Sequence, residues 1–85
     1  MTVRLLYFAW VRERTGLAQE TVELPPGLVT VADVMTWLRG RGDTYAAAFE
    51  RTDIIKAAID QTHVPHSAGI AGAREIAFFP PVTGG

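Results

Sequence analysis

Alternating hydrophobic and polar positions along the chain predict a series of short strands. Successive side chains of a strand point to opposite faces, so each alternating run has one face for a core and one for another surface. Pro25 ends the second run and Pro65 the fourth, because proline offers no donor to a strand ladder. We predict strands at residues 3–8, 19–24, 53–60, 61–64 and 75–79.

Helical spacing predicts one main helix. Apolar residues from Val31 to Leu38 recur every three or four positions, so one stripe of this segment faces a core. Thr30 is a candidate N-cap, and Asp33 stands three residues further on, where its carboxylate can reach back to the cap amide. Shorter helical segments are predicted at residues 9–14 and 44–50.

The order of these elements predicts an α+β domain. Two strands, the main helix and three further strands form one mixed sheet with a single main crossover helix on its face. We expect the first and last strands to lie side by side and parallel at the centre of the sheet. The chain then divides into a folded domain at residues 1–79 and an extended tail at residues 80–85.

Strand parity places two aromatic side chains on the outer face of this sheet. Arg4 marks the outer face of the first strand and Glu75 that of the last, which puts Phe8 and Phe79 on the same side. With parallel strands, both rings lie near the end from which the tail leaves. Exposed aromatic patches commonly mark interfaces. We therefore predict that Phe79 and Phe8, with His63 on the neighbouring edge, contact a partner protein.

Composition argues against several classes of function. The 85 residues are enough for one domain, and eight basic against nine acidic residues give a net charge of −1, which argues against binding nucleic acid or a membrane surface. No apolar stretch approaches the roughly 20 residues that cross a bilayer, and no leader pattern is visible, so we expect a cytoplasmic protein. The chain has no cysteine, which excludes disulfides and a persulfide carried on its own side chains.

The tail, residues 80–85, is the most informative segment for function. Pro80 and Pro81 restrict the backbone to extended geometry, so the chain leaves the sheet stiff. Gly84 and Gly85 have no Cβ, so they can pass through a channel too narrow for other residues and place a terminal carboxylate at its far end. A carrier whose C-terminus reacts inside another protein needs this arrangement. The alternative is a frayed terminus without a function.

The tail and the strand before it also carry a resemblance to a known family. Residues 75–85, Glu-Ile-Ala-Phe-Phe-Pro-Pro-Val-Thr-Gly-Gly, resemble the C-terminal signature of the MoaD family, the small subunits of molybdopterin synthase. Residues 8–13, followed by Gly16, are similar to the family's first strand and the turn after it. The resemblance implies a ubiquitin-like β-grasp fold with a flexible Gly-Gly tail. Where the family often has Gly-Asp-Glu, this chain has Ala-Arg-Glu at residues 73–75, which suggests a turn built on Gly72.

The resemblance also implies a sulfur-transfer cycle. An activating enzyme adenylates the carboxylate of Gly85, and a sulfurtransferase converts it to a thiocarboxylate. The tail then enters the large synthase subunit and gives sulfur to cyclic pyranopterin monophosphate, which forms the dithiolene of molybdopterin. In this cycle the chain donates sulfur without catalytic groups of its own, Gly84 gives access to the active site, and the two proteins form a heterotetramer. The tail residues expected to contact the large subunit are Pro80, Pro81, Val82 and Thr83.

The chain itself is not expected to bind a cofactor or a metal ion. No glycine-rich loop ends in Gly-Lys, so ATP belongs to the activating enzyme. His63 and His66 lack a third ligand for zinc, and Ser67 lacks the glycines of a nucleophile elbow. The alternatives are a carrier for thiamine or cysteine synthesis, a ubiquitin-like modifier joined to lysines, and a binding module with an inert tail.

Overall fold

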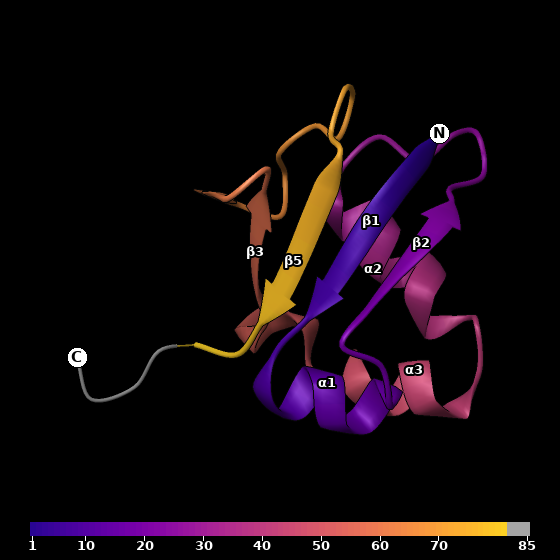
Figure 1. Ribbon diagram of the computed structural model, residues 1–85, viewed down its shortest axis with the longest axis vertical. Helices are drawn as coiled ribbons and strands as arrows, with labels where there is room; N and C mark the ends of the chain where they lie inside the picture. Colours follow the sequence, from indigo (N-terminus) through magenta and orange to yellow (C-terminus); the bar gives the residue numbers. More distant parts are fainter. Residues whose placement is uncertain (82–85) are drawn as a thin grey trace.

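The computed structural model describes residues 1–81, which form one sheet with helices on one face and at one end (Figure 1). No helix in this range combines the length and the apolar character that crossing a bilayer requires. The elements follow one another as β1 (Thr2–Tyr7), α1 (Ala9–Thr15), β2 (Gln19–Glu23), α2 (Val31–Arg39), α3 (Asp43–Ala48), the 3₁₀ helix η1 (Thr52–Ile54), β3 (Lys56–Ile59), β4 (Thr62–Val64) and β5 (Glu75–Phe79).

The sheet has the strand order β2-β1-β5-β3-β4. β1 and β5 run parallel at its centre, with Tyr7 opposite Phe78, and the other neighbours are antiparallel. The predicted mixed sheet and its central parallel pair are therefore confirmed, and this is the β-grasp arrangement. Because β1 and β5 are parallel, both end at the same edge of the sheet, which is where α1 and α3 lie in Figure 1.

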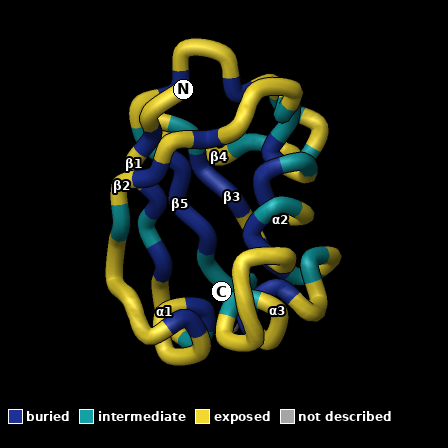
Figure 2. The backbone as a smooth tube through the Cα atoms, turned by 90° about the vertical axis from the view of Figure 1, so that its right-hand side faces the viewer, coloured by how far each residue is buried: buried dark blue, intermediate teal, exposed yellow. Residues whose placement is uncertain are grey.

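Strand parity sorts the side chains of β1 as the sequence predicts. Val3, Leu5 and Tyr7 are at most 1% exposed and belong to the core, whereas Arg4 is exposed on the other face. α2 supplies the facing layer through its buried stripe, and Figure 2 shows the buried parts of the sheet and of α2 turned toward each other. One face of the sheet is therefore covered by helix, and we call the other the open face.

The predicted capping box starts α2. The hydroxyl of Thr30 accepts a hydrogen bond from the backbone N–H of Asp33 at 3.2 Å, and the carboxylate of Asp33 accepts one from the N–H of Thr30 at 3.0 Å. The N–H of Val29 also donates to this carboxylate at 2.9 Å. These backbone donors favour the anion and lower the pKa of Asp33 below its ordinary value. The cap fixes where the helix begins, which the apolar stripe alone does not.

The third predicted strand is shorter than the sequence suggests. We expected residues 53–60 to be extended throughout, but residues 52–54 form η1 and the strand begins at Lys56. The guanidinium of Arg51 donates two hydrogen bonds to the carboxylate of Asp53, at 2.9 and 3.0 Å, and the N–H groups of Ile54 and Ile55 turn back to preceding carbonyls. This local hydrogen bonding overrides the β propensity of the two isoleucines.

Two turns at the far end of the sheet, away from the tail, match the sequence in part. Gly72 has a φ of +78°, as expected of a turn built on this residue. Asp60 and Gln61 both have positive φ and link β3 to β4, so Gln61 belongs to the hairpin turn and not to the predicted strand. The side chain of Asp60 also accepts hydrogen bonds from the N–H groups of Arg74 and Glu75, which ties the hairpin to the start of β5.

Candidate functional site

The base of the tail lies at the centre of one end of the molecule. β5 ends at Phe79, and Pro80 and Pro81 continue from it as partly buried residues. The N–H of Phe8 donates to the carbonyl of Phe78 at 3.1 Å, which joins the end of β1 to the end of β5. The predicted tail residues beyond this point lie outside the described residues; they are Val82, Thr83, Gly84 and Gly85.

The predicted aromatic residues lie on the open face beside this base. Phe8 is 48% exposed and Phe79 is partly buried, whereas Phe78, the residue before Phe79 in β5, is fully buried. The ring of the exposed His63 packs on that of Phe79, with centroids 5.2 Å apart. The structure thus places these three side chains as parity and the strand order require. Their role at an interface stays a prediction.

Sequence reasoning missed the small residues between these side chains. Ala58 and Ala77 are directly paired across β3 and β5, and they are 6% and 8% exposed. His63 pairs with Ala58 on the other side, so a flat strip of the open face runs from β5 to β4. Alternation with Ile76 and Phe78 places Ala77 on that face, but an alanine alone gives no signal of a contact surface.

A shallow hollow of about 630 Å³ adjoins the base of the tail. It lies where β3, β4 and β5 come together, and only two of its residues carry a basic side chain. Apolar groups form most of its wall, and the last described tail residue contributes to it. The lining residues are Lys56, Ala57, His63, Val64, Pro65, Phe79 and Pro81.

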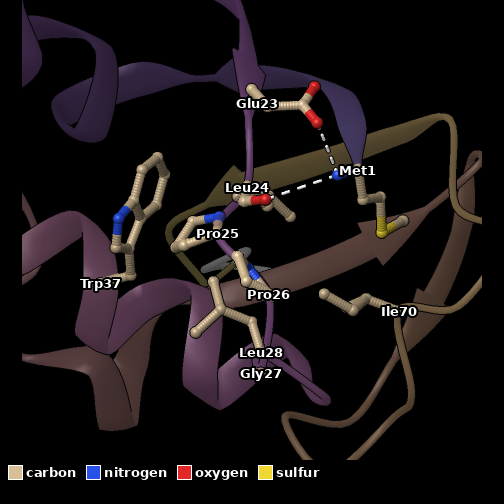
Figure 3. Close-up of a pocket in the computed structure, with 9 residues that line it drawn as sticks. All are labelled: Met1, Glu23, Leu24, Pro25, Pro26, Gly27, Leu28, Trp37 and Ile70. Atoms are coloured by element: carbon tan, nitrogen blue, oxygen red, sulfur yellow. Dashed lines mark hydrogen bonds and ion pairs between the residues drawn. The ribbon is translucent and has the colours of Figure 1, made fainter.

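A second recess, of about 480 Å³, lies at the opposite end of the sheet, where β2 leads into α2 (Figure 3). Leu24, Pro25 and Leu28 line it, with Trp37 at one side and Ile70 at the other. On its rim, the carboxylate of Glu23 accepts a hydrogen bond from the N-terminal nitrogen of Met1 at 2.8 Å (Figure 3). The recess therefore presents mainly apolar surface, and the carboxylate on its rim is paired with the N-terminal ammonium group.

A polar cluster that the sequence did not reveal lies on the covered side. The carboxylate of Glu20 accepts hydrogen bonds from the hydroxyls of Tyr7 at 2.8 Å and Tyr45 at 2.7 Å, and from Arg41 at 3.0 Å. Burial alone raises the pKa of Glu20, but these hydrogen bonds favour the anion and hold its pKa below the ordinary value. Burial and the bond to Glu20 raise the pKa of Tyr7 well above its ordinary value. The cluster joins α3 and the turn after α2 to β1 and β2.

The two histidines make contacts with different residues. The ring Nε2 of His66 donates to the carbonyl of Ile55 at 2.6 Å, whereas His63 packs on Phe79. Among residues 1–81, no three His, Cys, Asp or Glu side chains come close enough to hold a metal ion. The candidate functional features of residues 1–81 are therefore surface features: the aromatic rings of the open face, the hollow and the base of the tail.

Comparisons with known proteins agree with the fold. SAMP1 from Haloferax volcanii has a TM-score of 0.72 and 26% identity, with full coverage of both chains. A putative molybdopterin converting factor, subunit 1, from Pyrococcus furiosus has a TM-score of 0.71 and covers 96% of this chain and 99% of its own; at 23% identity it supports the fold alone.

Sequence comparison carries the assignment further. Residues 5–85 match the ThiS family. The molybdopterin synthase sulfur carrier subunit of Haemophilus influenzae is 37% identical over 83 residues, and that of Escherichia coli is 35% identical over the same length. Each alignment covers 98% of this chain and 99% of the relative.

The solved structures place the chain in the class of small β-grasp proteins, and the sequence matches place it in one family of that class. The chain belongs to the ThiS family. Within this family it is a sulfur carrier subunit of the molybdopterin synthase type, as its identity to two such subunits over nearly their full length shows. A subunit of this kind implies a larger partner subunit.

Proposed function

We propose that the chain carries sulfur on the carboxyl group of Gly85 and delivers it into the active site of the large subunit of molybdopterin synthase. The observation that carries this proposal is the position of the tail base. β5 is a central strand, and Pro80 and Pro81 lead the chain away from its end beside the exposed ring of Phe8. In this division of labour, residues 1–79 are a rigid domain that docks, and residues 80–85 are the arm that reacts.

The chemistry of the carboxyl group explains why partners are needed. A C-terminal carboxyl has a pKa of about 3.3–3.7, so at neutral pH it is an anion and a poor electrophile. Adenylation by an activating enzyme makes Gly85 a mixed anhydride with AMP and releases pyrophosphate. A sulfurtransferase then replaces AMP with sulfur. ATP binds to the activating enzyme, and we place the cycle in the cytoplasm, where ATP is available.

The thiocarboxylate then acts as the sulfur donor in the large subunit. Its sulfur bonds to a side-chain carbon of cyclic pyranopterin monophosphate, and an oxygen substituent leaves that carbon. Water then cleaves the acyl–sulfur bond of the resulting thioester, which leaves the sulfur on the substrate and returns Gly85 to a carboxylate. Two such transfers build one dithiolene. The acids and bases of this reaction belong to the large subunit, and this chain supplies the sulfur and its position. Gly84 keeps the end of the arm narrow enough to enter.

Docking of the folded domain on the large subunit determines where residues 80–85 enter it. We propose that Phe79, Phe8 and His63 on the open face contact the large subunit, and that Pro80 and Pro81 guide the arm into it. Val82 and Thr83 would then line the entrance of the active site. The assembly is expected to be a heterotetramer, with two copies of each subunit.

Protein modification is a second candidate, favoured by the likeness to SAMP1, which a second solved structure describes as a small archaeal modifier protein. A modifier would form an amide between Gly85 and lysine side chains of other proteins. Both functions need the same adenylation, so they differ only in what attacks the activated carbonyl: sulfur or an amine. Thiamine or cysteine synthesis would use the same thiocarboxylate with another acceptor.

The experiment that tests the proposal changes the length of the arm by one residue. Adding one glycine after Gly85 displaces the reacting carbon by about 3.5 Å, and a misplacement of about 1 Å can already cost 100-fold in rate. We expect sulfur transfer in the reconstituted synthase to be lost while thermal unfolding is unchanged. A matched variant with the extra glycine beside Gly27, in an exposed turn at the other end of the sheet, should transfer sulfur normally. Normal transfer by the extended chain, with its intact mass unchanged, would overturn the proposal.

A further inference from the structure

The hollow at the base of the tail combines an apolar wall with a positive charge that pairs with no carboxylate of residues 1–81. Val64, Pro65, Phe79 and Pro81 give the wall, and the volume of about 630 Å³ is large enough for a large apolar side chain of a partner. Lys56 is opposite Phe79 in the sheet and is exposed at the same site. Pro81 belongs both to the hollow and to the tail, so the hollow adjoins the path of the arm.

Lys56 is the only lysine of the chain, and its charge has no carboxylate partner within residues 1–81. The cations of the four ion pairs within residues 1–81 are the N-terminal ammonium group, Arg4, Arg41 and Arg51. While the open face is in water, an unpaired ammonium group costs nothing. Any protein that covers Phe79 also removes water from its strand neighbour, and a desolvated charge is costly unless it is paired.

We propose that the hollow receives an apolar side chain of the large subunit, and that a carboxylate of the large subunit beside it pairs with Lys56. This inference rests on the proposed function and adds the chemistry of the partner surface. The apolar contact supplies affinity, and the ion pair fixes which way the two subunits meet, because complementary charge sets register and suppresses wrong partners. A carboxylate also suits the rim because the second polar residue there, His63, is a further donor.

The test measures the affinity of the full-length chain for the purified large subunit by calorimetry, at low and at high sodium chloride. Lys56→Gln should weaken binding about 5-fold at low salt and Lys56→Glu on the order of 50-fold, because the second change adds repulsion between like charges. Lys56→Gln should lose less affinity on addition of salt than the unchanged chain, because a screened attraction has been removed. Lys56→Glu should recover affinity as salt is added, because salt screens the added repulsion.

Arg74→Glu is the matched control. It makes the same change of charge at an exposed residue just before β5, at the end of the sheet opposite the tail, and should alter affinity less than about 2-fold. Thermal unfolding of all variants checks that the fold is kept. An affinity of Lys56→Glu equal to that of Arg74→Glu would overturn the inference while leaving the proposed function intact. Absence of binding by the unchanged chain would overturn the proposed function as well.

Two other occupants of the hollow are distinguished by amide NMR spectra of the free chain. If deleting residues 82–85 shifted the signals of His63 and Val64, the chain's own tail would be the occupant. If these signals moved with protein concentration, a second copy would be. Either result would overturn the inference. We expect neither, and we expect both signals to shift when the large subunit is added.

Discussion

Neighbouring residues of β5 point to opposite faces of the sheet and differ in burial. Phe78 is fully buried on the covered face, where its ring lies 5.2 Å from that of Phe49 and 6.3 Å from that of Tyr7. Phe79 is only partly buried on the open face and contacts His63. One step along β5 thus separates a core aromatic from a surface aromatic. With the docking surface proposed above, stability and partner binding fall on different faces and can be changed separately.

The largest effect is expected from truncating the covered residue. Phe78→Ala removes a ring packed among aromatic neighbours and should lower the free energy of unfolding by about 3–5 kcal/mol. Phe79→Ala should lower it by less than half as much, because its ring is already partly in water. Urea denaturation of both variants measures the difference. Equal losses of stability would contradict the assignment of Phe78 to the core and Phe79 to the open face.

The same pair should behave in the opposite way in binding. Phe79→Ala is expected to weaken the complex with the large subunit by about 2 kcal/mol, as loss of a buried aromatic anchor does. Val29→Ala, at a residue 64% exposed in the turn before α2, is the control and should leave the affinity unchanged. Unchanged affinity of Phe79→Ala together with a large loss of stability would place Phe79 in the core and reverse our assignment of faces.

A smaller effect, with a distinct dependence on pH, is expected from the polar cluster on the covered side. Glu20→Gln removes a charged acceptor and should lower the free energy of unfolding by about 1–2 kcal/mol at neutral pH. The folded pKa of Glu20 lies below its ordinary value, so its stabilisation is complete above the unfolded pKa of about 4.3 and is lost as pH falls through the folded pKa. Denaturation at several pH values should show the gap between wild type and Glu20→Gln closing in acid. A gap that stays constant would mean that the charge of Glu20 does not contribute.

Much of the fold was predictable because its signals are local. The bounds of β5 match the predicted 75–79, and the capping box of Thr30 and Asp33 marks the start of α2. The strand at 53–60 was predicted too long, since the isoleucines gave a β signal that the hydrogen bonds between Arg51 and Asp53 overrode. A propensity cannot show such a competition between local contacts.

The site was predictable only where strand parity determines it. Strand alternation alone places Phe8 and Phe79 on the open face. The cluster around Glu20 joins residues from Tyr7 in β1 to Tyr45 in α3, and no spacing pattern in the sequence predicts it. The hollow beside Lys56 likewise depends on the pairing of three strands. The reactions assigned to Gly85 rest on the tail motif and the family, because this residue lies outside the described range.

The most direct test of the central claim is the intact mass of the chain after incubation with its activating enzyme, a sulfur donor and ATP. The account predicts a species heavier than the unmodified chain by the difference between one sulfur and one oxygen atom. Fragmentation should place the added mass in the peptide that ends at Gly85. Addition of the large subunit and its pterin substrate should return the chain to its original mass. If the chain stayed unmodified under these conditions, or if the sulfur lay elsewhere in the sequence, the account would be contradicted.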